Sequence, residues 1–233
     1  MEHIKTLDMR QHKGRIFFTT DLHGHYDLLH EKLKEVAFDS SVDILVSGAD
    51  WCDRGPDSQH VLDYLNEPWI YSVRGNHEQM IIDYIEALAD AGGDDRSVRQ
   101  PFEMLFFNGG QWFFDIKQSH QMRIYESFKS LPLAIELLTP TEKIGILHAQ
   151  CPYNNWDEFK KMTGAELEFN GAATAQWART NYDKQADIQV KGVDRLMVGH
   201  TPTDSGEVEV LGNAWYCDLG SFFRDKISFV QLM

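Results

Sequence analysis

Five short stretches of the chain combine acidic, imidazole and amide side chains at points where an apolar run ends. They are Asp21-Leu-His23-Gly24, Asp50-Trp-Cys-Asp53-Arg54-Gly55, Gly75-Asn76-His77-Glu78, His148-Ala149 and Gly199-His200-Thr201. Carboxylate, imidazole and amide groups all bind divalent metal ions, so the set predicts a metal site. Loops just beyond strand ends are a common place for a rigid sheet to carry such a site.

Each stretch taken alone has an ordinary structural explanation. Asp21 and His23 point the same way in an extended chain, but they also fit a polar strand end. Asn76 fits a helix N-cap. A histidine that ends an apolar run, such as His148 or His200, is more often a hydrogen-bonded core residue than a ligand. Separate structural explanations do not account for five such stretches at five predicted strand ends. We therefore interpret the set as one site.

The second stretch adds a feature suited to phosphate. Asp50 and Asp53 flank a turn closed by Gly55 and Pro56, and two carboxylates this close repel each other unless a cation compensates. Arg54 supplies one cation, and its planar guanidinium suits bidentate contact with phosphate. The ordinary alternative is a solvated turn.

The elements that must position these residues alternate between short apolar runs and helical patterns. In the first half we predict strands at 16–18, 43–47 and 69–73, and helices at 26–36, 57–65 and 79–91. A polar loop at 91–99 leads to a small helical insert that ends near 112–114. The second half predicts strands at 133–138, 143–148, 195–198, 208–211, 214–218 and 227–232, around a mixed helical and looped stretch at 152–191.

This alternation predicts an α+β, layered α/β architecture. The length of 233 residues, without an internal repeat or a low-complexity linker, predicts a single domain over residues 1–233. Residues 91–114 are the part that we expect to shape specificity. Core packing is the favoured role for the aromatic residues there, and a substrate groove is the alternative.

Composition excludes several classes of protein. The net charge of -14 argues against non-specific binding to nucleic acid. No apolar run approaches the length of a membrane helix, and residues 1–15 are too polar for a signal peptide. Three scattered cysteines, Cys52, Cys151 and Cys217, form no CxxC pair, so we expect a reducing, cytoplasmic location. The apolar residues indicate no particular dimer face, so no oligomeric state is predicted.

The order D-x-H-G, D-x-x-D-R-G, R-G-N-H-E, H-A and G-H-T resembles the metallophosphoesterase signature of the phosphoprotein phosphatase family. The match runs from Asp21 to Thr201 and continues to Asp218-Leu-Gly220. Asn108-Gly-Gly-Gln-Trp-Phe113 and Trp177-Ala-Arg179 are similar to the small prokaryotic branch, which includes bacteriophage lambda protein phosphatase and bacterial serine/threonine protein phosphatases. The resemblance implies the calcineurin-like fold, a central β-sandwich flanked by helices with metals at one edge.

The resemblance also implies a role for each matching residue. Asp21 and His23 would bind one metal ion, Asn76, His148 and His200 would bind a second, and Asp50 would bridge the two. Hard oxygen and imidazole ligands together suit two Mn²⁺ ions, with Fe or Zn²⁺ as alternatives. Two adjacent cations lower the pKa of a bridging water, and the resulting hydroxide would attack phosphorus in line.

Catalysis and phosphate binding follow from the same resemblance. Arg54, Arg74 and Arg179 would hold the phosphate oxygens and offset developing charge. His77 would donate a proton to the leaving group, and Asp53 would orient its ring.

The predicted activity is hydrolysis of phosphoserine and phosphothreonine in a phosphorylated protein or peptide, with phosphotyrosine as a further candidate. A dinucleoside tetraphosphate or other small-phosphoester hydrolase is the alternative on the same scaffold. Such tetraphosphatases typically carry Gly-Asn-His-Asp, and Glu78 argues against that assignment. A catalytically silent phosphoprotein-binding module is disfavoured, because every implied ligand and His77 are present.

Several residues near the site depart from the family pattern, among them Gln150, Cys151 and Ala178. Thr20 and Ala49 stand where glycine often precedes the first and the bridging aspartate, which bears on metal preference and rate. Cys52 replaces an apolar residue between the two aspartates. We favour a packing role for its side chain, and the alternative is a redox-sensitive thiol beside the metals.

Overall fold

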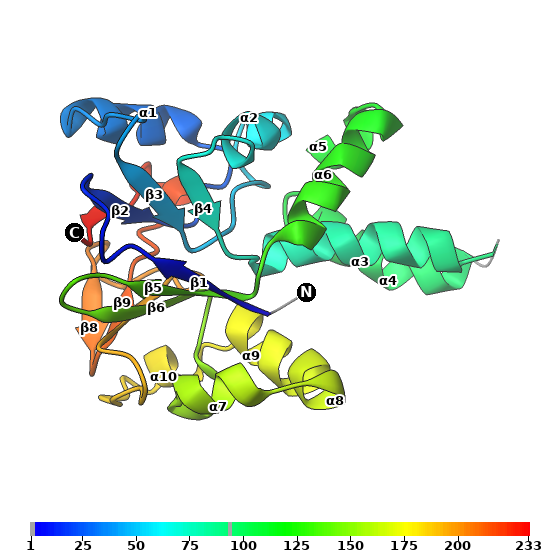
Figure 1. Ribbon diagram of the computed structural model, residues 1–233. Coiled ribbons are helices and arrows are strands. Elements are labelled where there is room, and N and C mark those ends of the chain that lie inside the picture. The colour runs from blue at the N-terminus through cyan, green and yellow to red at the C-terminus, as the bar shows by residue number, and fades with distance from the viewer. Residues whose placement is uncertain (1–2, 93–94) are drawn as a thin grey trace.

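Two β-sheets pack face to face at the centre of the computed structural model, which describes residues 3–92 and 95–233 (Figure 1). The larger sheet has the strand order β1-β5-β6-β7-β9-β8 and the smaller sheet the order β10-β2-β3-β4. In these orders the strands are Ile4–Asp8, Ala134–Leu138, Lys143–Leu147, Arg195–Val198, Ala214–Tyr216 and Glu209–Leu211, then Val230–Gln231, Ile16–Thr19, Ile44–Ser47 and Ile70–Ser72.

Parallel strands bring several chain segments to the same edge of each sheet. In the smaller sheet β2, β3 and β4 run parallel, and in the larger sheet β6, β7 and β9 do. All four residues of β2 are buried, as are three of the four in β3. Continuous apolar runs of this kind are typical of parallel strands that are covered on both faces.

The core between the sheets is built by alternate residues of the strands. Phe18 and Val46 of the smaller sheet pack with Ile135 and Ile146 of the larger one. Their neighbours on β2 and β3 point to the opposite face and pack beneath the helices, as the two-residue repeat of a strand requires. The predicted β-sandwich is therefore confirmed.

Helices cover both outer faces of the sandwich (Figure 1). The smaller sheet is covered by α1 (Tyr26–Glu35), the 3-10 turn Ser58–His60 with α2 (Val61–Leu65), α3 (Asn76–Asp90) and α6 (Gln118–Ser130). The larger sheet is covered by α7 (Trp156–Lys161), α9 (Ala172–Trp177) and α10 (Thr180–Asp183). The remaining helical segments are α4 (Asp95–Phe107), α5 (Trp112–Asp115), the 3-10 turn Pro152–Asn154, α8 (Gly164–Glu166), the π-helical turn Leu167–Gly171 and α11 (Ser221–Arg224).

The structure corrects the sequence-based prediction at two helices. Helix α3 begins at Asn76, not at 79, because Glu78 accepts a hydrogen bond from the backbone of Gly75 and so caps the first turn. The polar stretch 91–99 is not one loop, since α4 begins at Asp95, while residues 93 and 94 lie outside the described residues. Polar residues form a helix readily on an exposed face, so polarity alone was a poor guide.

Strand β1 and helix α6 were not predicted. Strand β1 lies in the polar N-terminal stretch, where only Ile4 and Leu7 are buried and burial does not follow the two-residue repeat of a strand. Helix α6 buries Ile124, Tyr125 and Phe128, which have helical spacing in a segment otherwise rich in polar residues.

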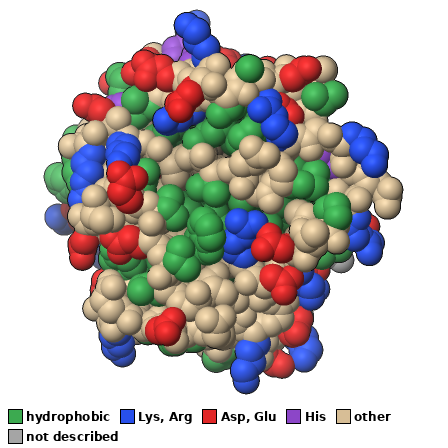
Figure 2. Space-filling model, turned by 90° about the vertical axis from the view of Figure 1, so that its left-hand side faces the viewer, with side chains coloured by type: hydrophobic (Ala, Val, Ile, Leu, Met, Phe, Trp, Pro, Cys, Tyr) green, Lys and Arg blue, Asp and Glu red, His purple; other side chains and the backbone are tan. Residues whose placement is uncertain are grey.

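Helices α3 and α4 lie side by side and extend away from the sheets (Figure 1). Of the described residues, no helix combines the length and the apolar character needed to cross a bilayer. Figure 2 shows one face of the molecule, on which acidic and basic side chains are interspersed around central hydrophobic groups. The acidic excess is therefore not gathered into one patch on that face.

Candidate metal centre

The predicted ligands lie at one edge of the sandwich, where strands of both sheets end, in loops or, for Asn76, at the first residue of α3. After β2 come Asp21 and His23, after β3 Asp50, after β4 Asn76, after β6 His148 and after β7 His200. All six side chains are buried. Burying carboxylates costs free energy unless an opposite charge is close, so their collection in one place indicates a shared cation.

The backbone of these loops is unusual. Left-handed φ values, which favour glycine, occur at several non-glycine site residues: Asp21 (53°), His23 (46°), Ala49 (82°), Asp50 (53°), Asp53 (70°), Arg54 (69°) and His200 (66°). Such conformations cost free energy and persist only where the surrounding structure holds them. Their concentration here distinguishes the site from the rest of the fold. Ala49 has the largest of these φ values, which explains why glycine suits that position.

His148 lies between the ligands of the two sheets. Its Nδ1 donates to Gly48 O at 2.7 Å, and its Nε2 lies 2.8 Å from Asn76 Oδ1 and 3.3 Å from Asp50 Oδ2. Burial lowers the pKa of His148, but the Asp50 carboxylate outweighs it and raises the pKa to about 10. The Asp50 carboxylate thus favours a positive charge at this position, which is the charge that a metal ion would supply.

Asp50, His148 and His200 bring ligand atoms within 4.8 Å of one another and form one candidate metal-binding group. His200 Nδ1 lies 3.0 Å from Asn76 Oδ1, and Nε2 lies 3.2 Å from Trp177 O. His200 Nδ1 and Asn76 Oδ1 thus face the same space. The four predicted ligands of the second metal are thus brought together.

A second candidate group contains His23, Asp50 and His77. His23 Nδ1 donates to Cys52 O at 2.9 Å, which leaves Nε2 as an acceptor, and Nε2 lies 3.7 Å from Asp50 Oδ2. Burial and the neighbouring His77 hold the pKa of His23 well below its ordinary value, so the ring is neutral. A neutral imidazole with a fixed tautomer is the form that binds a metal. Asp50 belongs to both groups, as expected of a bridging ligand.

Asp21 links the loop after β2 to the loop after β7 but belongs to neither candidate metal-binding group. Both of its carboxylate oxygens accept from the backbone N–H of His200 at 3.0 Å, and Oδ2 also accepts from Thr20 Oγ1 at 2.6 Å. Burial, together with nearby Asp218 and Asp50, raises the pKa of Asp21 well above its ordinary value. A cation would offset the electrostatic repulsion between these three neighbouring carboxylates, so the residues fit a metal centre.

His77 and Asp53 form a fully buried pair at the start of α3. His77 Nδ1 lies 2.6 Å from Asp53 Oδ2, a charge-assisted hydrogen bond that fixes the ring. The other ring nitrogen, Nε2, has no hydrogen-bond partner among the described residues and lies 3.8 Å from Asp50 Oδ2. Nδ1 is thus held by Asp53, and Nε2 is left available at the candidate metal-binding group of His23, Asp50 and His77.

Two of the three predicted phosphate-binding arginines contact histidines of the candidate metal centre. Arg54 Nη1 donates to His23 Nε2 at 2.9 Å, and its guanidinium lies 4.5 Å from the ring centre of Phe222. Arg179 Nε lies 3.2 Å from His200 Nε2. A guanidinium therefore contacts one histidine of each predicted metal site, and two cationic groups flank the space between them.

Arg74 makes no hydrogen bond to another predicted site residue in the described part of the chain. Its side chain lines a cavity of about 510 Å³ with Lys129 and Glu168, and its Nε is buried without a hydrogen-bond partner among the described residues. Burial lowers the pKa of Arg74, while acidic residues of α3, Asp83 foremost, oppose that shift. The structure thus does not join Arg74 to the two arginines described above.

Glu78 has a structural role that the sequence did not reveal. Its buried carboxylate accepts from the backbone N–H groups of Gly75 at 2.8 Å, Asp50 at 3.2 Å and Trp51 at 2.9 Å. It therefore ties the first turn of α3 to the loop that carries Asp50. The three-residue spacing from Gly75 to Glu78 is that of a capping box, and this was the signal available in the sequence.

Two further residues at the site were not assigned a role from the sequence. Trp112 Nε1 donates to Asp53 Oδ1 at 2.7 Å, although it was interpreted only as a packing or groove residue. Asp218 belongs to the matching pattern and is buried, and burial raises its pKa to about 6. The contact of Trp112 has no local sequence signal, because Asp53 comes from a distant part of the chain.

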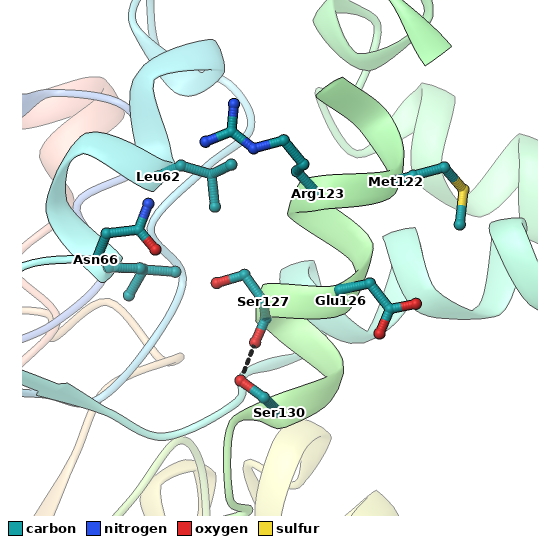
Figure 3. Close-up of a pocket in the computed structure, with 8 residues that line it drawn as sticks. Leu62, Asn66, Met122, Arg123, Glu126, Ser127 and Ser130 are labelled. Carbon is teal, nitrogen blue, oxygen red and sulfur yellow. Dashed lines mark hydrogen bonds between the residues drawn. The ribbon is translucent and has the colours of Figure 1, made fainter. Parts of the chain in front are cut away.

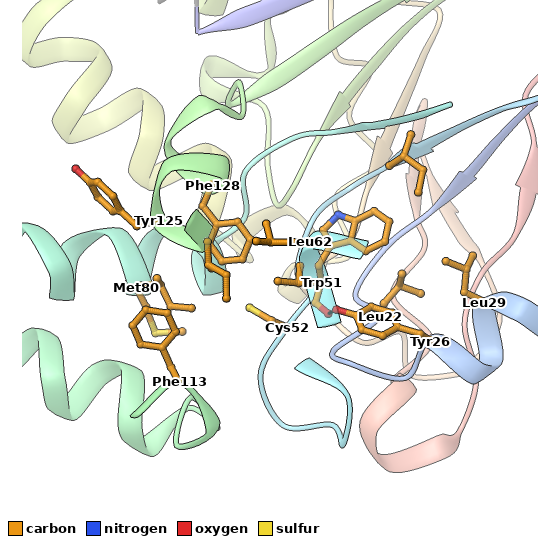
Figure 4. Close-up of a cluster of buried hydrophobic side chains, with 14 of the residues drawn as sticks. Leu22, Tyr26, Leu29, Trp51, Cys52, Leu62, Met80, Phe113, Tyr125 and Phe128 are labelled. Carbon is orange, nitrogen blue, oxygen red and sulfur yellow. Dashed lines mark hydrogen bonds between the residues drawn. The ribbon is translucent and has the colours of Figure 1, made fainter. Parts of the chain in front are cut away.

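Cys52 packs beside Trp51, Met80 and Phe113 in the hydrophobic cluster beneath the helices (Figure 4). Its side chain is fully buried, and burial together with Asp53 raises the pKa of the thiol well above its ordinary value. A buried, protonated thiol is a poor nucleophile toward oxidants. Both features favour the packing role over the redox-sensitive thiol.

A pocket of about 560 Å³ between α2 and α6 is separate from this centre (Figure 3). Its lining includes Leu62, Asn66, Met122 and Arg123, and no predicted site residue. A smaller pocket of about 260 Å³ is lined by Met80 and Trp177 among others, and the Trp177 carbonyl contacts His200. The position of the 560 Å³ pocket therefore does not coincide with the candidate metal centre.

Residues 14–204 match the family described as calcineurin-like phosphoesterases. The chain is 32% identical to serine/threonine-protein phosphatase 2 of Escherichia coli (strain K12), over 95% of this chain and 94% of the relative. It is 29% identical to serine/threonine-protein phosphatase 1 of Salmonella typhimurium (strain LT2), over 93% of this chain and 91% of the relative.

Solved structures share the fold at lower identity. A cold-active protein tyrosine phosphatase has a TM-score of 0.64 at 17% identity, covering 100% of this chain and 76% of that one. A proposed diadenosine tetraphosphatase has a TM-score of 0.60 at 19% identity, covering 99% and 98%. The shared architecture thus spans proteins whose names indicate different substrates.

Proposed function

Because the chain belongs to the family of calcineurin-like phosphoesterases and is a metal-dependent hydrolase of phosphoric monoesters, we propose that its substrates are phosphoserine and phosphothreonine side chains of proteins. The full-length similarity to bacterial serine/threonine-protein phosphatases supports this substrate class. The observation that carries it is the His77–Asp53 pair, whose outer ring nitrogen is unpartnered among the described residues at the candidate metal group.

Asp21 and His23 would hold one metal ion, Asn76, His148 and His200 would hold the other, and Asp50 would be shared by both. When bound, two divalent metal ions supply the nucleophile by lowering the pKa of a water molecule, and they offset charge on the phosphoryl oxygens. The mixture of carboxylate, amide and imidazole ligands favours Mn²⁺, and Fe or Zn²⁺ suits the same set.

His77 acts on the leaving group. The alkoxide of serine or threonine is a strong base, so breaking its bond to phosphorus requires a proton from the enzyme. Asp53 holds Nδ1 at 2.6 Å, so Nε2 is the nitrogen left to act on the leaving group. A phenoxide leaves with less help, so His77 matters most for alkyl esters.

Arg54 and Arg179 bind the phosphate. Each guanidinium contacts a histidine at the edge of the metal group, and phosphate oxygens would replace those contacts. Arg74 is proposed for the same task on family resemblance, and its position beside the acidic residues of α3 gives that assignment the least geometric support of the three.

The test compares a phosphoserine peptide with diadenosine tetraphosphate, using protein stripped with chelator and restored with Mn²⁺. We expect metal-dependent phosphate release from the peptide, reduced at least 100-fold in His77→Asn, since a general acid contributes about 10²–10⁴-fold. His60→Asn, at an exposed histidine, is the matched control and should retain activity. Preferential cleavage of the dinucleotide would overturn the proposed substrate. Turnover of neither compound, with metal bound, would indicate a binding module.

A further inference from the structure

The segment between α4 and α5 contacts two functional residues that lie more than fifty positions earlier in the chain. Trp112 Nε1 donates to Asp53 Oδ1 at 2.7 Å, and the backbone N–H of Arg54 donates to Gly109 O at 3.1 Å. We call residues 109–112 the brace. It holds one oxygen of the carboxylate that orients His77 and also the backbone of a proposed phosphate-binding arginine.

The approach of the brace to Arg54 requires glycine. Gly109 has a φ of +99°, and a Cβ added there would lie 2.7 Å from Arg54 N and 2.8 Å from Arg54 Cγ. The next residue, Gly110, donates its N–H to Leu105 O at 3.0 Å, which anchors the brace to the end of α4. Leu105 is fully buried, so this anchor is part of the core and not a mobile surface contact.

The residues held by the brace need external support. Asp53 and Arg54 have φ values of 70° and 69°, a conformation that two successive L-residues do not maintain by themselves. Asp53 is fully buried, and each of its carboxylate oxygens faces one nitrogen donor, Trp112 on Oδ1 and His77 on Oδ2. Without the indole donor, one buried oxygen would lose that partner and the carboxylate could rotate, taking the imidazole with it.

We propose that Trp112 is a positioning residue for the proton donor His77, acting through Asp53. Gly109 likewise positions Arg54, through its direct backbone contact. This inference rests on the proposed function, since it uses the roles assigned there to His77 and Arg54. Residues 91–114 were predicted to shape specificity. In this proposal the end of that segment instead supports the catalytic step itself.

The first test is Trp112→Phe, which removes the donor and keeps an aromatic ring. We expect kcat for a phosphoserine peptide to fall about tenfold, because part of the general-acid contribution is lost, while kcat for p-nitrophenyl phosphate changes less than about twofold. Trp69→Phe is the matched control, since Trp69 Nε1 donates to an exposed carboxylate, Glu67, at 2.8 Å. That variant should match the wild type on both substrates.

The second test combines Trp112→Phe with His77→Asn. If the indole acts through the proton donor, adding Trp112→Phe to His77→Asn should lower peptide turnover no further. A fully additive loss, or an equal loss on both substrates in the single variant, would show a general structural effect and overturn the proposal.

Gly109→Ala keeps the proposal testable even if Trp112→Phe does not fold. Displacement of Arg54 should raise KM for p-nitrophenyl phosphate about tenfold and leave kcat within about twofold, since a bidentate phosphate contact is weakened. An unchanged KM would contradict the positioning of Arg54. If the wild type hydrolyses p-nitrophenyl phosphate but no phosphopeptide, the proposed function fails, and the Gly109→Ala result still decides this part of the inference.

Discussion

The carboxylate of Glu78 accepts a hydrogen bond from the backbone N–H of Asp50 at 3.2 Å, and so connects the first turn of α3 to the loop after β3. The same carboxylate accepts from Gly75 and Trp51. The proposed bridging ligand is therefore held by a residue that has no direct contact with phosphate or metal in the proposed mechanism. The position of Asp50 depends on this support as much as on its own loop.

Replacing Glu78 by glutamine tests that support. The amide keeps one oxygen but turns an NH₂ group toward backbone N–H donors, so at least one buried hydrogen bond is lost. We expect the free energy of unfolding to fall by about 1–3 kcal/mol, measured by denaturant unfolding of the metal-free protein. Glu31→Gln, at an exposed position on α1, is the control and should unfold like the wild type. Equal stability of the Glu78 and Glu31 variants would contradict the role given to Glu78.

Asp43 predicts a pH dependence of stability far from the site. Its buried carboxylate accepts from the backbone N–H of Arg15 at 2.9 Å and from the guanidinium, with Nη2 at 2.5 Å, and the Arg15 hydrogen bonds lower the pKa of Asp43 to about 2. Because the pKa is lower in the folded state, the stabilisation is present above about pH 4, the ordinary range of an aspartate, and is lost as the pH falls toward 2.

We therefore expect Asp43→Asn to destabilise the protein by about 1–3 kcal/mol at pH 7, since a buried charged acceptor is removed. The difference from the wild type should shrink steadily between pH 4 and pH 2, as followed by thermal unfolding. Asp8→Asn is the control: the pKa of Asp8 is also lowered to about 2, by Arg10, but that pair is exposed and its loss should barely change the melting temperature. A difference that stays constant over the same pH range would refute the account.

Removal of the metals should destabilise the fold. The buried carboxylates of Asp21, Asp50 and Asp218 face one another, and a cation bound between them stabilises only the folded state. Addition of Mn²⁺ at 100 times its Kd should raise the free energy of unfolding by about 2.7 kcal/mol. Calorimetry across a Mn²⁺ titration measures this shift. It should be much smaller in His148→Ala and unchanged in His30→Ala, an exposed histidine. A melting temperature independent of Mn²⁺ in the wild type would argue against a metal centre.

The three thiols should be unreactive in the folded protein. Cys52, Cys151 and Cys217 are free and fully buried, and burial raises the pKa of each thiol. We expect a thiol-specific disulfide reagent to modify them only after unfolding in denaturant. Activity should also survive peroxide in thiol-free, metal-replete buffer. Rapid modification of Cys52 in the native state would revive the redox interpretation.

Much of the site could be predicted because its residues follow recognisable strands. Ile16–Thr19 and Ile44–Ser47 are short apolar runs, and Asp21 and Asp50 come directly after them. Because these strands run parallel in the structure, the polar residues at their ends meet at one edge. The six predicted ligands accordingly lie together, although the proximity of their ligand atoms groups His77, and not Asp21, with His23 and Asp50.

What could not be predicted depends on contacts between distant segments. The hydrogen bond from Trp112 to Asp53 joins residues 59 positions apart, and no local pattern distinguishes that indole from its aromatic neighbours. Arg74 lies next to the Gly-Asn-His-Glu stretch in sequence, yet its side chain lines a separate cavity, because the backbone turns there into α3. Adjacency in sequence was therefore a poor guide to side-chain direction at a helix start.

The hydrogen bonds from the backbone N–H of His200 to the carboxylate of Asp21 span 179 residues and join loops that follow strands of different sheets. Protein synthesis proceeds from the N-terminus, so the loops after β2, β3 and β4 leave the ribosome long before those after β6 and β7. A nascent chain can hold only part of the ligand set until residue 200 has emerged. Assembly of the full ligand set, and any hydrolytic activity, should consequently wait until residue 200 has left the ribosome and both sheets can close.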